Sequence, residues 1–126
     1  MNALTIDLED WHQAYALRYG NHQARPSGHL EEQLDAVLAL LHERTIGATF
    51  FVLGALAQQR PDLIRRVSSE GHEIACHSHS HRRVTALSPS EFARETREAK
   101  SRLEDITGMR VAGYRAPEFS ITAEAS

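Results

Sequence analysis

Three clusters of chemically active residues stand out in the sequence, and one of them contains three histidines. His77, His79 and His81 alternate with serines in the run His-Ser-His-Ser-His. His77 and His81 are four residues apart, so on one helical turn both imidazoles would point the same way, while His79 would point elsewhere. Two histidines at this spacing can bind one divalent metal ion. The alternative is a polar loop in which the histidines have no joint role.

A second cluster is acidic and follows the first apolar run of the chain, where Asp7, Glu9 and Asp10 occur together. Alternate residues of a strand face the same side, so Asp7 and Glu9 would lie together if the strand continues through Glu9. One carboxylate could then bind a metal while the other stays free as a base, which is the division of roles that metal-assisted hydrolysis needs. Two solvated acids at a strand end are the alternative.

The third cluster is the run Arg-Ala-Pro-Glu-Phe, which begins at Arg115 directly after another short apolar run. A guanidinium can hold a carboxylate in a fixed bidentate geometry. Pro117 has no N–H, so the amide of Glu118 or Phe119 would have to donate any hydrogen bond to an oxyanion here. A surface salt bridge and a turn are the alternative. Trp11, next to the acidic cluster, is expected either to line a cleft or to pack against other side chains of the fold.

The elements that must position these clusters alternate between strand and helix. Apolar, aromatic and β-branched runs predict strands over residues 3–8, 48–53, 72–77 and 110–114. Helical spacing and capping residues predict helices from an N-cap at Ser27 to about Arg44, over 61–71 and over 88–108. Residues 11–26 are expected to form an irregular loop. The order β-α-β-α-β-α-β predicts an α/β fold with parallel strands, and all three clusters then follow carboxyl ends of strands.

The composition is that of one globular domain. The 126 residues leave no room for a second domain, and the net charge of -3 argues against a nucleic-acid partner. A single cysteine excludes an internal disulfide framework. No run approaches the ~18 apolar residues of a membrane span. The first residues reach Asp7 without an apolar signal segment, so we expect a cytoplasmic location.

Together the three clusters resemble motifs of the polysaccharide deacetylase family of carbohydrate esterases (carbohydrate esterase family four), which includes chitooligosaccharide and peptidoglycan deacetylases. Residues 5–10 are similar to the family's first motif, 71–81 to its second and 113–119 to its third. Residues 49–52 are similar to the strand between the first two motifs, and the resemblance covers residues 3–122. The residues around the motifs most resemble those of a branch of the family that is linked to bacterial exopolysaccharide synthesis.

This resemblance implies a role for each matched residue. Asp7 would act as catalytic base, His77 and His81 would bind the metal, and Arg115 would orient the base. The implied reaction is hydrolysis of N-acetyl groups on hexosamine units of a polysaccharide or oligosaccharide. The implied cofactor is Zn²⁺, with Co²⁺, Ni²⁺ and Mn²⁺ as alternatives, and its function would be to activate the attacking water.

The first motif departs from the usual family pattern. Where the common form has a second, metal-binding Asp, this chain has Leu8. Branches of the family with an acid two residues after the base use that acid instead, which makes Glu9 the implied third ligand and Asp10 the fallback.

The implied fold is the N-terminal half of a distorted (β/α) barrel. A closed barrel usually needs about 200 residues or more, and the family's later motif, whose His acts as general acid, has no counterpart here. We therefore expect the N-terminal part of a longer deacetylase domain. Alone it should bind metal weakly, deacetylate poorly or not at all, and form a homodimer through the open edge of its sheet. Two other functions stay open: a metal-independent amidohydrolase of a small cyclic amide, and a non-catalytic partial domain.

Overall fold

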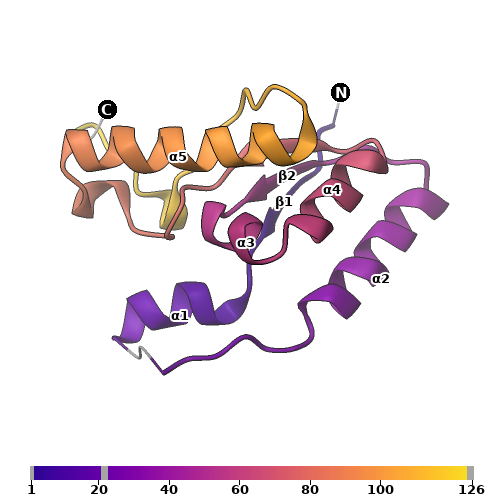
Figure 1. Cartoon of the computed structure of the whole chain (residues 1–126), viewed down its shortest axis with the longest axis horizontal. Coiled ribbons are helices and arrows are strands. Elements are labelled where there is room, and N and C mark those ends of the chain that lie inside the picture. Colours follow the sequence, from indigo (N-terminus) through magenta and orange to yellow (C-terminus); the bar gives the residue numbers. More distant parts are fainter. Residues whose placement is uncertain (1, 21–22, 125–126) are drawn as a thin grey trace.

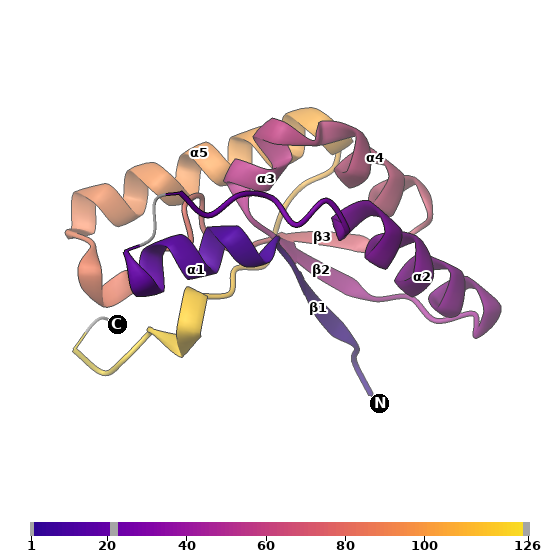
Figure 2. The ribbon, with the colours of Figure 1, turned by 90° about the horizontal axis from the view of Figure 1, so that it is seen from below.

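The computed structural model describes residues 2–20 and 23–124, and its centre is a parallel sheet of three short strands. In chain order these strands are β1 (Thr5–Leu8), β2 (Thr49–Val52) and β3 (Glu73–Cys76), and they lie side by side in the order β1-β2-β3. Each pair is joined by a helical crossover, which is how parallel neighbours must be connected. The carboxyl ends of all three strands therefore meet at one edge of the sheet (Figures 1 and 2).

Helices connect and cover the strands. They are α1 (Trp11–Tyr19), α2 (Leu30–Glu43), α3 (Gly54–Gln59), α4 (Pro61–Ser69) and α5 (Pro89–Thr107), with single 3-10 turns η1 (Val84–Ala86) and η2 (Pro117–Phe119). Figure 2 shows α3, α4 and α5 along one side of the strands. No helix in the described part of the chain has the length and apolar character needed to cross a membrane.

The core lies between the sheet and these helices. Phe50 and Val52 of β2 are fully buried, and Leu38 of α2, Ile64 of α4 and Leu103 of α5 pack into the same cluster. Side chains alternate across a strand, so burial of Phe50 and Val52 directs Phe51 to the opposite face. That opposite face is less covered, because Phe51 is only half-buried there. One face of the sheet therefore stabilises the fold, while the other stays accessible.

The predicted α/β architecture and its three main crossover helices are confirmed. Helix α4 begins with Pro61 in its first turn, as expected. Helix α5 begins with the predicted capping box, in which the Glu91 amide donates to Ser88 Oγ at 3.2 Å and the Ser88 amide donates to Glu91 Oε2 at 2.8 Å. It ends at Gly108, whose φ of 69° is the left-handed conformation that favours glycine.

Several predicted boundaries are wrong. Residues 11–19 are helical rather than irregular, residues 23–26 are irregular as expected, and residues 21–22 of the predicted loop lie outside the described residues. Helix α2 begins two residues later than predicted, because Ser27 Oγ accepts from the His29 amide and His29 is the N-cap. The short helix α3 was not predicted.

The expected fourth strand is also absent from the described residues. Within 110–114 only Tyr114 forms a bridge, with Cys76. The amide of Val111 donates to Glu104 Oε1 at 3.0 Å rather than to a strand neighbour. Residues 113–115 still lie beside the end of β3. The Cys76 amide donates to the Gly113 carbonyl at 2.8 Å, and the Arg115 amide donates to the Cys76 carbonyl at 2.9 Å. The third cluster is thus held at the strand ends without a full strand.

Gly54, the first residue of α3, is expected to be intolerant of any side chain. A Cβ there would lie 2.5 Å from His79 Nδ1 and 3.0 Å from Ala99 Cβ. Gly54→Ala should therefore lower the free energy of unfolding by about 1–3 kcal/mol. Gly47→Ala is the matched control, because its Cβ would meet nothing within 4 Å. Urea titrations of both variants test this, and equal midpoints for the two would contradict it.

Candidate metal centre and active site

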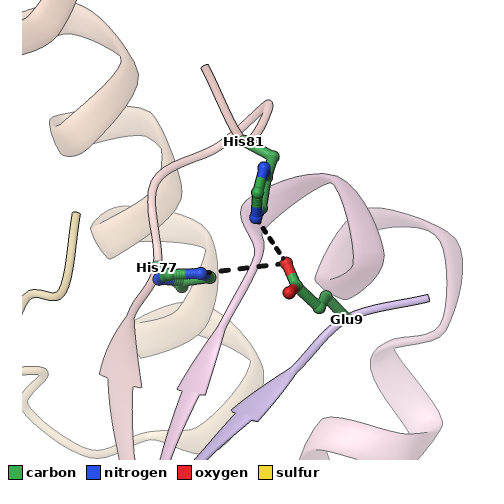
Figure 3. Close-up of side chains that lie close together, drawn as sticks. All are labelled: Glu9, His77 and His81. Atoms are coloured by element: carbon green, nitrogen blue, oxygen red, sulfur yellow. Dashed lines mark ion pairs between the residues drawn. The ribbon is translucent and has the colours of Figure 1, made fainter. Parts of the chain in front are cut away.

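Glu9, His77 and His81 come together at the carboxyl edge of the sheet. Glu9 follows β1 directly, His77 follows β3, and His81 lies on the loop that continues from it (Figure 3). Glu9 Oε2 lies 2.8 Å from His81 Nε2 and 3.8 Å from His77 Nε2. One ligand atom from each of the three residues lies within 4.8 Å of the other two. The site is therefore a Glu/His cluster that could hold a metal ion.

The two histidines converge by a loop and not by the helical turn that their spacing suggested. Residues 77–81 contain no helix. The first amides of α3 hold the loop: Gly54 donates to the Ser78 carbonyl at 2.9 Å and Ala55 donates to the His79 carbonyl at 2.9 Å. Ser78 Oγ accepts from the His81 amide at 3.0 Å. Ser78 and α3 set the geometry of this loop, and neither role was predicted from the sequence.

The orientation of His77 is fixed by the backbone of the third cluster. His77 Nδ1 lies 2.8 Å from the carbonyl oxygen of Arg115. A carbonyl can only accept, so Nδ1 carries a proton and Nε2 is the nitrogen that faces Glu9. A carbonyl partner of this kind is the usual support of a metal-binding histidine.

Backbone strain is concentrated around the same site. Among the described residues other than glycine, four with left-handed φ values lie here: Ser78 at 61°, His81 at 65°, Glu118 at 54° and Phe119 at 53°. Such conformations cost on the order of 1–3 kcal/mol each and persist where the surroundings enforce them. The fold thus places strained backbone where it directs side chains to one point.

The donor set fits a divalent metal ion. Glu9 Oε2 is buried and faces Nε2 of both histidines, while His81 Nδ1 is buried without a hydrogen-bond partner in the described part of the chain. Burial opposes protonation of His81, but the Glu9 carboxylate outweighs it and raises the pKa of His81 above its usual value. Two imidazoles and one carboxylate are ligands that zinc accepts, with further positions left for water or substrate.

Asp10, the fallback ligand, lies elsewhere. It is the N-cap of α1, and its Oδ2 accepts from the Ser27 amide at 3.0 Å. The same oxygen lies 3.4 Å from His12 Nδ1. Asp10 therefore holds the start of α1 and the segment before α2, and the geometry favours Glu9 for the cluster.

Asp7 and Arg115 form the ion pair that the sequence predicted. Arg115 Nη1 donates to Asp7 Oδ1 at 2.7 Å, while Nη2 donates to Thr5 Oγ1 at 2.7 Å. The guanidinium carbon lies 4.1 Å from the centre of the Phe51 ring, a cation–π distance. Asp7 Oδ2, the other carboxylate oxygen, lies 3.9 Å from His77 Nε2. Thr5 and Phe51 were not predicted, and only their strand positions beside Asp7 could have indicated them.

A small hollow of about 160 Å³ lies over this arrangement. It is lined by Asp7, Glu9, His77, His81, Arg115, Ala116, Glu118 and Phe119. Two predicted lining residues do not belong to it. Pro117 is buried and its carbonyl accepts from Ser120, so its role is structural. Trp11 lies on α1 and is 49% exposed.

Two neighbours of the histidine cluster point away from it. His79 Nε2 lies 3.8 Å from Glu98 on α5, as its intermediate spacing predicted. Cys76 is packed in the core, and burial raises the pKa of its thiol to about 11. Neither side chain contributes to the site.

The chain belongs to the polysaccharide deacetylase family. The family model matches residues 23–126, which is most of the chain. The match begins after Asp7 and Glu9, so the assignment of these two residues rests on the geometry described above.

Relatives with known names support the same family. The chain is similar to the chitooligosaccharide deacetylase of Sinorhizobium fredii, 44% identical over 63 residues, which are 50% of this chain and 29% of that protein. It is also similar to the peptidoglycan-N-acetylglucosamine deacetylase of Bacillus cereus, 34% identical over 83 residues, which are 66% of this chain and 28% of that protein. In both cases the similarity spans less than a third of the relative.

Solved structures show the same fold. The peptidoglycan deacetylase PdaC from Bacillus subtilis superposes with a TM-score of 0.73 at 28% identity, covering 98% of this chain and 52% of that one. A CE4 family pseudoenzyme from Bacillus anthracis superposes with a TM-score of 0.76 at 21% identity, covering 98% of this chain and 37% of that one. The second likeness shows the fold alone. The described fold is therefore that of part of a CE4 deacetylase, as predicted.

Proposed function

We propose that the chain carries the metal and base half of a deacetylase that hydrolyses N-acetyl groups on hexosamine units of a polysaccharide. The observation that carries the proposal is the Glu9–His77–His81 cluster beside the Asp7–Arg115 ion pair. Family membership and the names of the relatives support the substrate class.

Each of these residues has a part in the proposed reaction. Glu9, His77 and His81 would hold Zn²⁺, which when bound activates water and polarises the acetyl carbonyl. Asp7 accepts the proton of the attacking water, and Arg115 keeps its carboxylate in place through the hydrogen bond to Oδ1. As the C–N bond breaks, Asp7 passes this proton to the nitrogen, so the sugar leaves as a free amine and the acetyl group is released as acetic acid, which ionises to acetate. The amide of Glu118 or Phe119, at the rim of the hollow, donates to the developing oxyanion.

Acetate release tests this proposal directly. The zinc-loaded chain is incubated with tetra-N-acetylchitotetraose, and acetate is measured against the same chain treated with a chelator. We expect slow release that requires zinc. Hydrolysis that the chelator leaves unchanged would favour a metal-independent amidohydrolase. Zinc and saccharide binding without acetate release above the protein-free background would favour a non-catalytic domain.

Two earlier expectations stay predictions. Strand β1 is at the edge of the described sheet and is largely exposed, which supports a homodimer through that edge. Sedimentation of the purified chain would decide this. The cytoplasmic location also stays a prediction, and fractionation of cells would test it.

A further inference from the structure

One face of α1 carries three exposed aromatic side chains. Trp11, Tyr15 and Tyr19 follow one another at intervals of four residues and are 49%, 38% and 64% exposed. Each step of four residues turns a helix by about 40°, so the three rings lie within about 80° of its surface. We call these three residues the aromatic face of α1.

The rings form a continuous row. The ring centres of Trp11 and Tyr15 are 5.2 Å apart, and those of Tyr15 and Tyr19 are 4.7 Å apart. The planes are tilted by 59° and 40°, so the rings follow the helix side by side. Over the eight residues the row advances about 12 Å along the helix. This row offers apolar surface together with two phenol hydroxyls.

This row does not serve the core. The buried cluster draws no residue from the aromatic face, and α1 lies outside the layer of α3, α4 and α5 in both views (Figures 1 and 2). Contiguous exposed aromatic surface is uncommon on a soluble domain and usually marks a site where something binds.

A second hollow extends from the metal site to Arg18 of α1, beside the aromatic face. Arg18 lies on the same side of α1, three residues after Tyr15, and its guanidinium carbon is 5.8 Å from the Tyr19 ring centre. Arg18 lines a hollow of about 360 Å³ together with His81 and Glu118. His81 and Glu118 also line the hollow over the metal site. The surface therefore continues from the metal site to α1.

We propose that the aromatic face of α1 holds further sugar units of the polysaccharide, beyond the unit whose acetyl group lies at the metal site. The apolar C–H faces of pyranose rings pack against the aromatic rings, while Tyr hydroxyls and Arg18 donate to sugar oxygens. This inference rests on the proposed function for the identity of the ligand. It adds where the chain of sugars runs and predicts that affinity grows with its length.

Trp11 is the only tryptophan of the chain, so its fluorescence reports directly on this face. Titration with hexa-N-acetylchitohexaose should change the Trp11 emission saturably, and with higher affinity than di-N-acetylchitobiose. The double variant Tyr15→Ala/Tyr19→Ala should lose about tenfold in affinity for the hexaose and bind it no better than the biose. Alanine favours helix, so α1 should persist in this variant.

The matched control is Leu40→Ala/Met109→Ala. These side chains are 54% and 65% exposed and lie outside α1. The control variant should bind the hexaose like the unchanged chain. Equal affinity for hexaose and biose in the unchanged chain would overturn the inference while leaving acetate release as the separate test of the proposed function. The inference would also be overturned if the Trp11 emission changed with protein concentration and the unchanged chain formed a dimer that the double tyrosine variant did not form. The aromatic face would then serve self-association.

Discussion

Neutralising Glu9 is expected to abolish stoichiometric metal binding, while neutralising its neighbour Asp10 is not. Glu9 Oε2 is buried between His77 and His81, so Glu9→Gln removes the anionic ligand with little change of shape. Changes in residues that merely support a ligand cost 10–100-fold in metal affinity, so loss of the ligand charge itself should cost more than about 100-fold. Zinc titration by calorimetry measures this directly.

The matched variant is Asp10→Asn, which removes one negative charge from the adjacent position. Asn keeps the oxygen that accepts from the Ser27 amide, so α1 should stay in place. Zinc affinity of this variant should stay within a few-fold of the unchanged chain. His81→Ala should lose zinc as Glu9→Gln does. Loss of zinc in Asp10→Asn with retention in Glu9→Gln would reverse the ligand assignment.

The second large effect concerns the base. Asp7→Asn should lower the rate of acetate release by about 10²–10⁴-fold, because an amide cannot accept the proton of the attacking water. Zinc affinity should change little, since Asp7 is not one of the three residues of the cluster and is held by Arg115. Rate and zinc stoichiometry are measured on the same preparation. An equal rate in the variant would exclude Asp7 as the base.

Arg115 provides a separate test of how Asp7 is held. Arg115→Lys loses the planar fork that bonds Asp7 and Thr5 together, and should lower the rate less than Asp7→Asn does. Thr5→Val is the control, because it removes only the Nη2 contact and leaves the one to Asp7. If Thr5→Val lowered the rate of acetate release as much as Arg115→Lys does, the effect would come from the contact of Arg115 with Thr5 on β1 and not from its contact with the Asp7 carboxylate.

The sequence was sufficient for strands β1, β2 and β3 and indicated the residues of the cluster. Strand β2 is a short run of aromatic and β-branched residues, which favour a strand. Helix α5 begins at a capping box with proline beside it. Parallel strands bring their carboxyl ends together, so placing Glu9, His77 and Arg115 after three predicted strands already predicted their meeting, although the last of these strands is only a single bridge.

The remaining errors have physical causes. Helix α1 was predicted as a loop because the segment is polar and is followed by Gly20 and Pro26, although its aromatic side chains recur every four residues. Helix α3 has six residues, too few for a periodic pattern. The histidine loop depends on left-handed residues and on amides of α3, neither of which a local spacing encodes. These features are set by tertiary contacts.

The hydrogen bond between Arg115 and Asp7 joins positions 108 residues apart, so the site closes a loop of almost the whole chain. A chain that has not yet added β1 to its sheet lacks Asp7 and Glu9 together and presents only the two histidines. On the proposed function, metal uptake would therefore report molecules in which β1 has joined the sheet. A metal ion bound only in that state would also stabilise the pairing of β1 with β2, by a free energy that grows with the logarithm of its free concentration. The proposed metal would then link two distant segments of the chain as well as activate water.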